Sequence, residues 1–306
     1  MIAHQLALMK REFWEHRSIW VTPIAIGIVI SVATLTGQMS ISAYGGEVDL
    51  GIAALSNTDE MHRRIAIMAM MGAVTGVFAV GAAIVMIFYS LDTLYSERKD
   101  KSILFWRSLP LTDAEQVVSK LLTIALVIPA AALAITFLTH LVVMTISSLW
   151  LMAEGANPWH LIWSSAPLFD VWAANILFAL AMTLWFSPFF GWFLFVSAYT
   201  NRSPLLMSMM PIIVLPLIEM LLLPTELLAS AVWGRLRLDN VPIFGIEFKQ
   251  IFDEDDVLQM SSQDVSMFAA LDLGRFFASP SMWAGLVVCG LLVAAAIYVR
   301  RFKDDS

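Results

Sequence analysis

Two ionisable residues lie inside long apolar segments, where an acid or a base could carry protons. Glu219 follows Pro204 within one such segment, and His140 lies within an earlier one. A charged carboxylate is costly in lipid, so we expect Glu219 to face a protein interior, a cavity or a partner, and to be able to hold a proton. Together the two residues would form a proton relay. The alternatives are a structural hydrogen bond for Glu219 and a hydrogen-bonded buried role for His140.

The sequence has no signature of an enzyme or of a nucleotide-binding domain. It contains no GxxxxGK[ST] loop to hold ATP phosphates, no HExxH metal motif and no GxSxG nucleophile motif. The remaining histidines lack metal-ligand spacing, and the single cysteine, Cys289, lies in an apolar run. The 18 methionines are scattered, which favours packing over a copper path. We therefore expect no catalytic residue, no cofactor and no metal site in this chain.

The composition indicates an integral membrane protein. Apolar residues make up 59% of the 306 residues and charged residues only 14%, and the mean hydropathy is +0.78. A soluble domain carries about 25% charged residues. We expect one all-α polytopic membrane domain over residues 1–306, in contact with membrane lipids. The net charge of −7 gives no indication of nucleic-acid binding, because the charges are segregated by side.

Six apolar stretches are long enough for transmembrane helices, since a span needs about 20 residues. We expect these spans at 20–42, 66–91, 119–150, 170–199, 204–224 and 281–300. Residues 2–19 alternate apolar and charged positions at helical spacing, which predicts an N-terminal helix lying in the membrane interface. Residues 225–280 predict an extracytoplasmic insert of short helices between the fifth and sixth spans.

Lysine and arginine residues predict the orientation of the spans. Six spans leave both termini on one side, and basic residues concentrate on the cytoplasmic side of a membrane protein. The outer loop at 152–169 has no lysine or arginine. The basic residues on the side of the termini are Lys10, Arg11, Arg17, Arg98, Lys99, Lys101, Arg107, Lys120, Arg202, Arg300, Arg301 and Lys303. We therefore expect both termini and the 92–120 loop in the cytoplasm, and the chain in the inner membrane.

The 92–120 loop combines charged residues with an aromatic patch. We expect Glu97 and Arg98 to form an ion pair that makes the loop move with its helix. A short helix with an apolar face can dock into a groove on another protein, with Phe105 and Trp106 as the anchor. The alternative is an interfacial helix that only contacts lipid. The residues that we assign to docking and coupling are Glu97, Arg98, Lys101, Ile103, Leu104, Phe105, Trp106 and Arg107.

Two blocks of sequence carry a resemblance to a known family. The first contains Asp92, Tyr95, Glu97-Arg98, the segment 102–110, Asp113 and Ser119-Lys120. The second contains Pro188, Gly191-Trp192, Val196-Ser197-Ala198, the segment 202–206, Pro211 and Glu219. Together these blocks resemble bacterial ABC-2 type transporter permeases.

The resemblance implies a transmembrane subunit of an ABC exporter. The loop after the second span would contain a coupling helix that receives motion from a separate ATPase subunit, and that partner would bind ATP and Mg. Two permease subunits, as a homodimer or a heterodimer, would surround a central path, in which we place Glu219 and His140. The alternative is a proton-coupled secondary transporter that uses Glu219 and His140. The sequence leaves the substrate open.

Overall fold

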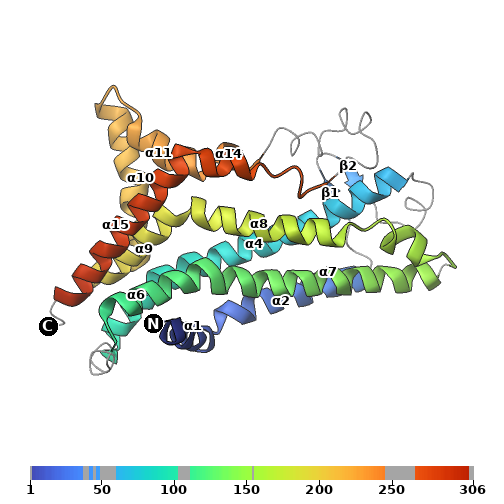
Figure 1. Cartoon of the computed structure of the whole chain (residues 1–306), viewed down its shortest axis with the longest axis horizontal. Helices are drawn as coiled ribbons and strands as arrows, with labels where there is room; N and C mark the ends of the chain where they lie inside the picture. The colour runs from blue at the N-terminus through green and yellow to red at the C-terminus, as the bar shows by residue number, and fades with distance from the viewer. Residues whose placement is uncertain are drawn as a thin grey trace.

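The computed structural model describes residues 2–36, 41–43, 46–48, 60–102, 111–153, 155–244 and 266–302. In this part of the chain the structure is all-α apart from one small hairpin, in which β1 (Ile41–Ala43) pairs antiparallel with β2 (Gly46–Val48). Long helices form an elongated bundle, with α2, α4 and α7 side by side (Figure 1). The expected all-α fold is confirmed.

Six helical segments in the described residues are long and apolar enough to cross a membrane, by length and composition. They are α2 (Ser18–Leu35), α4 (Glu60–Lys99), α6 with η1 and α7 (Asp113–Ala153), α8 (Leu168–Trp185), α10 (Pro204–Leu222) and α15 (Pro280–Phe302). These six candidate spans agree with the expectation of a multi-pass membrane protein. The first of these segments, α2, ends at Leu35, whereas we expected the first span to extend to residue 42. The 40 residues of α4 extend about 60 Å at 1.5 Å per residue, twice the hydrocarbon thickness of a bilayer.

Proline residues mark two breaks in the long helices. The α8 helix ends at Trp185, and α9 (Ser187–Tyr199) has Pro188 in its first turn. Proline is tolerated there because backbone N–H groups in the first turn of a helix make no hydrogen bond within the helix. A π-helical turn, η1 (Thr123–Val127), separates α6 (Asp113–Leu122) from α7 (Ile128–Ala153), directly before Pro129. The π-turn accommodates the carbonyl that proline leaves unpaired.

Both ends of the chain reach the same end of the bundle, which we call the inner end (Figure 1). The N-terminal helix α1 (Ile2–Glu15) packs on α6, and the Gln5 side chain donates to the Glu115 carbonyl at 3.2 Å. The last helix, α15, packs along α9 and also meets α6. Gly191 permits the close packing of α9 on α15, because a Cβ there would lie 3.1 Å from the Cys289 Cα. This arrangement agrees with an even number of spans.

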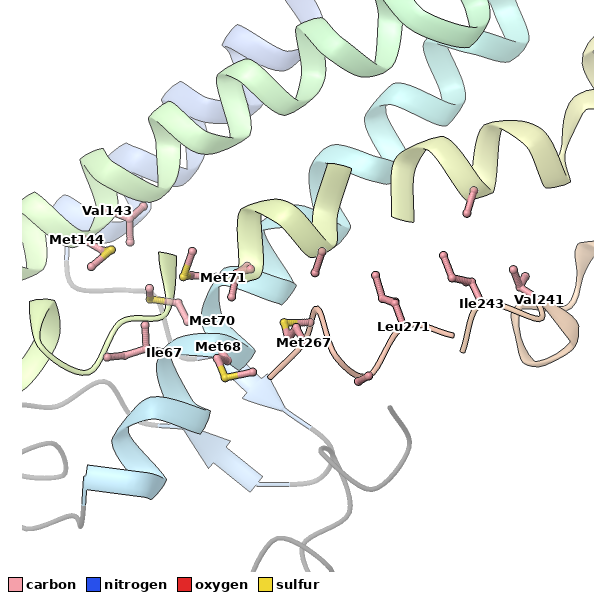
Figure 2. Packing of buried hydrophobic residues seen from close by; sticks show 14 of the residues in the cluster. Ile67, Met68, Met70, Met71, Val143, Met144, Val241, Ile243, Met267 and Leu271 are labelled. Carbon is pink, nitrogen blue, oxygen red and sulfur yellow. The ribbon is translucent and has the colours of Figure 1, made fainter. Parts of the chain in front are cut away.

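At the opposite, outer end, an apolar core joins the long helices to the segment that precedes α15. Methionine side chains fill much of it, as expected for a flexible side chain in an irregular space. Figure 2 labels Ile67, Met68, Met70 and Met71 of α4, Val143 and Met144 of α7, and Val241, Ile243, Met267 and Leu271. No cluster of His, Cys, Asp or Glu in the described residues could hold a metal ion.

The predicted insert at 225–280 contains helices in its described parts. They are α11 (Leu227–Leu236), the 3₁₀ turn η3 (Leu238–Asn240) and α14 (Leu273–Ala278). Asp170, in the first turn of α8, accepts hydrogen bonds from the Ser266 hydroxyl and from the Met267 amide, the latter at 2.9 Å. This carboxylate therefore fixes the returning chain onto the bundle. The acidic run at 253–256 lies outside the described residues.

Candidate functional site

The loop between the second and third spans begins and ends on well-defined helices. The α4 helix ends at Lys99, and the exposed Lys101 that follows has a positive φ of 56°. On the far side, Thr112 and Glu115 form a capping box that starts α6. Residues 103–110, which include Ile103, Leu104, Phe105, Trp106 and Arg107, lie outside the described residues. Their docking role stays a prediction.

Four buried charged residues form a network beneath this loop. They are Glu12 of α1, Glu97 of α4, Lys120 of α6 and Arg300 of α15, and we call them the inner ion network. The Lys120 ammonium lies 3.0 Å from Glu12 Oε1 and 2.9 Å from Glu97 Oε1, and it donates to Thr93 Oγ1 at 2.8 Å. One buried cation therefore connects the N-terminal helix to both helices that bound the loop.

Arg300 extends the network to the last helix. Its Nη1 donates to Glu97 Oε2 at 2.7 Å, and its Nε donates to Asp113 Oδ1 at 3.1 Å. Its Nη2 donates to the side-chain carbonyl of Gln116. Because Asp113 and Gln116 belong to α6, a single planar guanidinium holds α15 to both ends of the loop. Glu97 is shared between Lys120 and Arg300.

Glu12 accepts hydrogen bonds on both of its carboxylate oxygens. Lys120 Nζ donates to one carboxylate oxygen, and the Tyr89 hydroxyl donates to the other at 2.7 Å. Burial acts to raise the pKa of Glu12, but the positive charge of Lys120 and the hydrogen bonds from Tyr89 and Lys120 outweigh it, so the pKa lies below its usual value. Glu12 is therefore ionised at neutral pH.

The buried charges of the network are compensated by one another and not by water. Each of the four side chains is at most 7% exposed. Breaking a buried ion pair by removing one partner costs about 3–5 kcal/mol, because the other charge is left without compensation. Elements that are more than a hundred residues apart in sequence are consequently coupled in this network: displacing one of α1, α4, α6 or α15 alone would separate charges in a region with little water.

Arg98 links the same end of α4 to α9. Its Nη2 donates to the Ser197 and Thr200 carbonyls, each at 2.6 Å, which satisfies carbonyl groups at the C-terminus of α9. In return, the Ser197 hydroxyl oxygen accepts from the amide of Tyr95 at 3.0 Å. Glu97 and Arg98, which we expected to pair with each other, thus have these separate partners. The two sequence blocks that carry the family resemblance meet at this contact.

These contacts divide the predicted coupling residues into two groups. Glu97 and Arg98 are engaged within the chain, so they attach the loop to the bundle. Lys101 is exposed and available to another molecule. Any effect of Glu97 on a docked partner would therefore be indirect, through the position of the loop.

Glu219 accepts hydrogen bonds from the first turn of α11. Its Oε1 accepts from the Leu227 amide at 2.8 Å, and its Oε2 accepts from the Leu228 amide at 2.7 Å and the Ala229 amide at 2.9 Å. Thr225 adds a hydroxyl donor at 3.2 Å. The carboxylate fills the role of a helix cap from a neighbouring helix, since these amides have no partner inside α11. The structural alternative for Glu219 therefore has a definite geometry.

His140 has a different set of partners. Trp172 Nε1, which can only donate, lies 3.2 Å from His140 Nδ1, so Nδ1 is an acceptor. The proton then lies on Nε2, which donates to the Met71 carbonyl at 3.1 Å. Both ring nitrogens of the neutral imidazole are satisfied. The ring holds α7, α4 and α8 together.

The structure does not bring Glu219 and His140 together. Glu219 accepts from amides of α11, whereas His140 contacts Met71 of α4 and Trp172 of α8. A relay within one chain would need further groups between them.

Sequence reasoning missed the most highly connected residues of the site. Arg300 counted only as a basic residue that orients the spans, Lys120 as such a residue and as part of the family resemblance, and Glu12 as part of an interfacial helix. A signal was present for Lys120 and Arg300, because each lies at the end of an apolar segment, where lipid would penalise its charge. A carboxylate and a cation at the same end of different spans are natural partners, but the sequence does not show which helices are adjacent.

Comparison with models of known protein families gives no match, and searches of the curated proteins and of the solved structures find none either. The chain is thus described by its own geometry: a multi-pass membrane protein with a buried ion network at its inner end.

Proposed function

We propose that this protein is the permease subunit of an ATP-binding cassette exporter of the ABC-2 type, which forms the translocation path and couples to a separate ATPase subunit. The observation that carries the proposal is the inner ion network. It fixes both ends of the 100–112 loop to α1 and α15, as a transmitting element requires. The family resemblance of the loop supports the same reading.

The mechanism follows from how the loop is attached. A partner ATPase would bind ATP and Mg, close, and displace the docked patch around Phe105 and Trp106. Lys120 and Arg300 would pass this displacement to the four helices of the network, while Arg98 would pass it to α9. The bundle would then alternate between inward and outward access, in a homodimer or heterodimer of permease subunits located in the inner membrane with both termini in the cytoplasm. This chain itself performs no ATP chemistry in this scheme.

The experiment compares the ATP hydrolysis that accompanies purified variants. The tagged chain is purified from its own membranes in mild detergent, and Mg-dependent ATP hydrolysis is measured per mole of chain. Phe105→Ala with Trp106→Ala should lower this activity at least about tenfold, because two aromatic anchors are removed. The matched control is Tyr298→Ala with Phe302→Ala, an exposed aromatic pair at the inner end of α15 whose rings are 4.7 Å apart. The control should keep the wild-type activity.

Two results would contradict the proposal. The wild-type protein could purify without any nucleotide hydrolase, or the Phe105 and Trp106 variant could retain as much activity as the control. Transport by the lone chain in liposomes under a proton gradient would instead support a secondary transporter.

A further inference from the structure

An apolar cavity of about 620 Å³ opens between α9, α10, α11 and α15. Its walls include Trp192 of α9, Pro211 and Pro216 of α10, Leu228 of α11 and Val288 of α15. Its volume lies within the range of about 300–1,000 Å³ that is typical of small-molecule sites. The cavity is therefore large enough for part of an organic ligand.

Arg235 is the one charged residue among the described residues that line the cavity. Its Nη1 donates to the Trp185 carbonyl at 2.7 Å, its Nη2 donates to the Ser281 carbonyl, and its guanidinium carbon lies 4.6 Å from the centroid of the Trp185 ring. Gly285 leaves the space for this group, since a Cβ there would clash with Nη1 of Arg235. These contacts fix the guanidinium at the wall of the cavity.

The charge of Arg235 is not neutralised by the described part of the chain. Its hydrogen-bond acceptors are carbonyl oxygens, and no carboxylate of the described residues lies within 4.0 Å of it. Burial lowers the pKa of Arg235, which shows that its surroundings disfavour the cation, although arginine remains protonated. A guanidinium has five N–H donors in a planar fork, so donors remain for an anion. An anionic ligand would supply the missing charge.

The direction from which a ligand arrives is set by α10. This helix buries only Ser208, Pro216 and Glu219 among its residues and exposes a continuous apolar surface, including Ile213, Leu217 and Leu221. In a membrane, hydrocarbon chains cover such a surface. Leu215 of α10 and Val288 of α15 line the cavity and are about half exposed, so the cavity opens on this apolar surface, and its walls match an acyl chain better than a water-soluble anion.

We propose that this cavity binds an anionic phospholipid, with an acyl chain between α9, α10 and α15 and the phosphate on Arg235. The guanidinium binds the phosphate through two parallel N–H donors, an arrangement that favours arginine over lysine. The apolar walls bind the acyl chain through van der Waals contacts. The charge of Arg235 gives the selectivity for the headgroup. This site is independent of an ATPase partner.

The test measures lipid binding by the purified chain in detergent, using native mass spectrometry with phosphatidylglycerol and phosphatidylcholine of identical acyl chains. The wild-type protein should bind phosphatidylglycerol about tenfold or more tightly than phosphatidylcholine, since phosphatidylglycerol has a net negative charge, whereas the choline cation of phosphatidylcholine offsets the charge of its phosphate. Arg235→Gln should abolish the preference. Arg237→Gln is the matched control, because Arg237 is 71% exposed and lies only two residues away.

A second variant keeps Arg235 in place and fills the cavity. Val288→Trp should lower the binding of both lipids while the thermal midpoint stays near that of the wild type, so the test survives if Arg235→Gln does not fold. Equal binding of the two lipids by the wild type would overturn the proposal. So would an unchanged preference in Arg235→Gln, an equal loss in Arg237→Gln, or a Val288→Trp protein that binds both lipids as well as the wild type does. No outcome depends on ATP hydrolysis, so this site can fail while the transport proposal stands.

Discussion

The two ends of the bundle stabilise buried charge in different ways. At the inner end, Lys120 and Arg300 contact carboxylates from other helices, so charge is paired with charge. At the outer end, Glu219 accepts from backbone amides, and Arg235 donates to backbone carbonyls. Ion pairs between side chains bind separate helices to each other, whereas a carboxylate on amides orders one local turn.

This difference indicates what each end is suited to do. The inner end resists separation of its helices, and a force applied to one of them is shared by the others. The outer end contains an open apolar cavity and short helices held by individual caps, so its parts can adjust separately. The following predictions, from the largest effect to the smallest, test whether the contrast holds.

Lys120→Met should produce the largest loss of stability. Removal of the ammonium takes the closest cation from Glu12 and leaves Arg300 to compensate Glu97 alone, at a cost of about 3–5 kcal/mol. The measurement is the thermal midpoint of the purified protein in detergent. The control is Lys99→Met, because Lys99 is exposed at the end of α4. Equal midpoints for the two variants would show that the network contributes little.

Arg300→Leu should destabilise the protein by less, about 2–3 kcal/mol, because Glu97 keeps Lys120 as a partner. The neighbouring exposed Arg301 offers a matched control in Arg301→Leu. Limited proteolysis at the inner end should detect the released α15 in the first variant alone. If both variants are cleaved at the same rate, Arg300 does not anchor the last helix.

Glu219→Gln should have a smaller and local effect of about 1–2 kcal/mol. An amide retains one acceptor oxygen, so part of the cap on α11 is lost. Hydrogen exchange should accelerate at the Leu228 and Ala229 amides and stay unchanged at the inner end. Glu226→Gln is the control, because that side chain is exposed. Accelerated exchange throughout the bundle would mean that the outer end is not locally organised.

The smallest effect is a dependence of stability on pH at the inner end. The pKa of Glu12 is lower in the folded protein than in the unfolded chain, where glutamate titrates at about 4.3. Its contribution to stability is therefore complete above that value and is lost as the pH falls through the folded pKa. Glu12→Gln should weaken the dependence of the thermal midpoint on pH below about pH 5. An identical pH profile in wild type and variant would rule out this contribution.

The sequence predicted the helical class because apolar length alone requires it, and it predicted that both termini and the loop share one end. It could not predict the partners of Glu97 or Arg98, because a nearest-neighbour pair is the simplest assumption when helix adjacency is unknown. It also left two roles open for Glu219, one in the translocation path and one as a structural hydrogen-bond acceptor. The amides of α11 that donate to Glu219 are known only once the position of α11 is known. Tertiary contacts between residues such as Glu12 and Lys120 are set by packing, which a single sequence does not reveal.

The central claim is that the inner ion network makes α1, α4, α6 and α15 move as one unit. Spin labels at Lys99→Cys and Arg301→Cys, in a Cys289→Ser background and in labelled chains diluted with unlabelled chains, report the distance between the inner ends of α4 and α15 within one chain of the complex purified with its ATPase. The account predicts one narrow distance distribution that is the same with and without ATP, and a broad distribution when Lys120→Met is added. A distribution in the parent protein that shifts with ATP, or one that stays narrow after Lys120→Met, would contradict it.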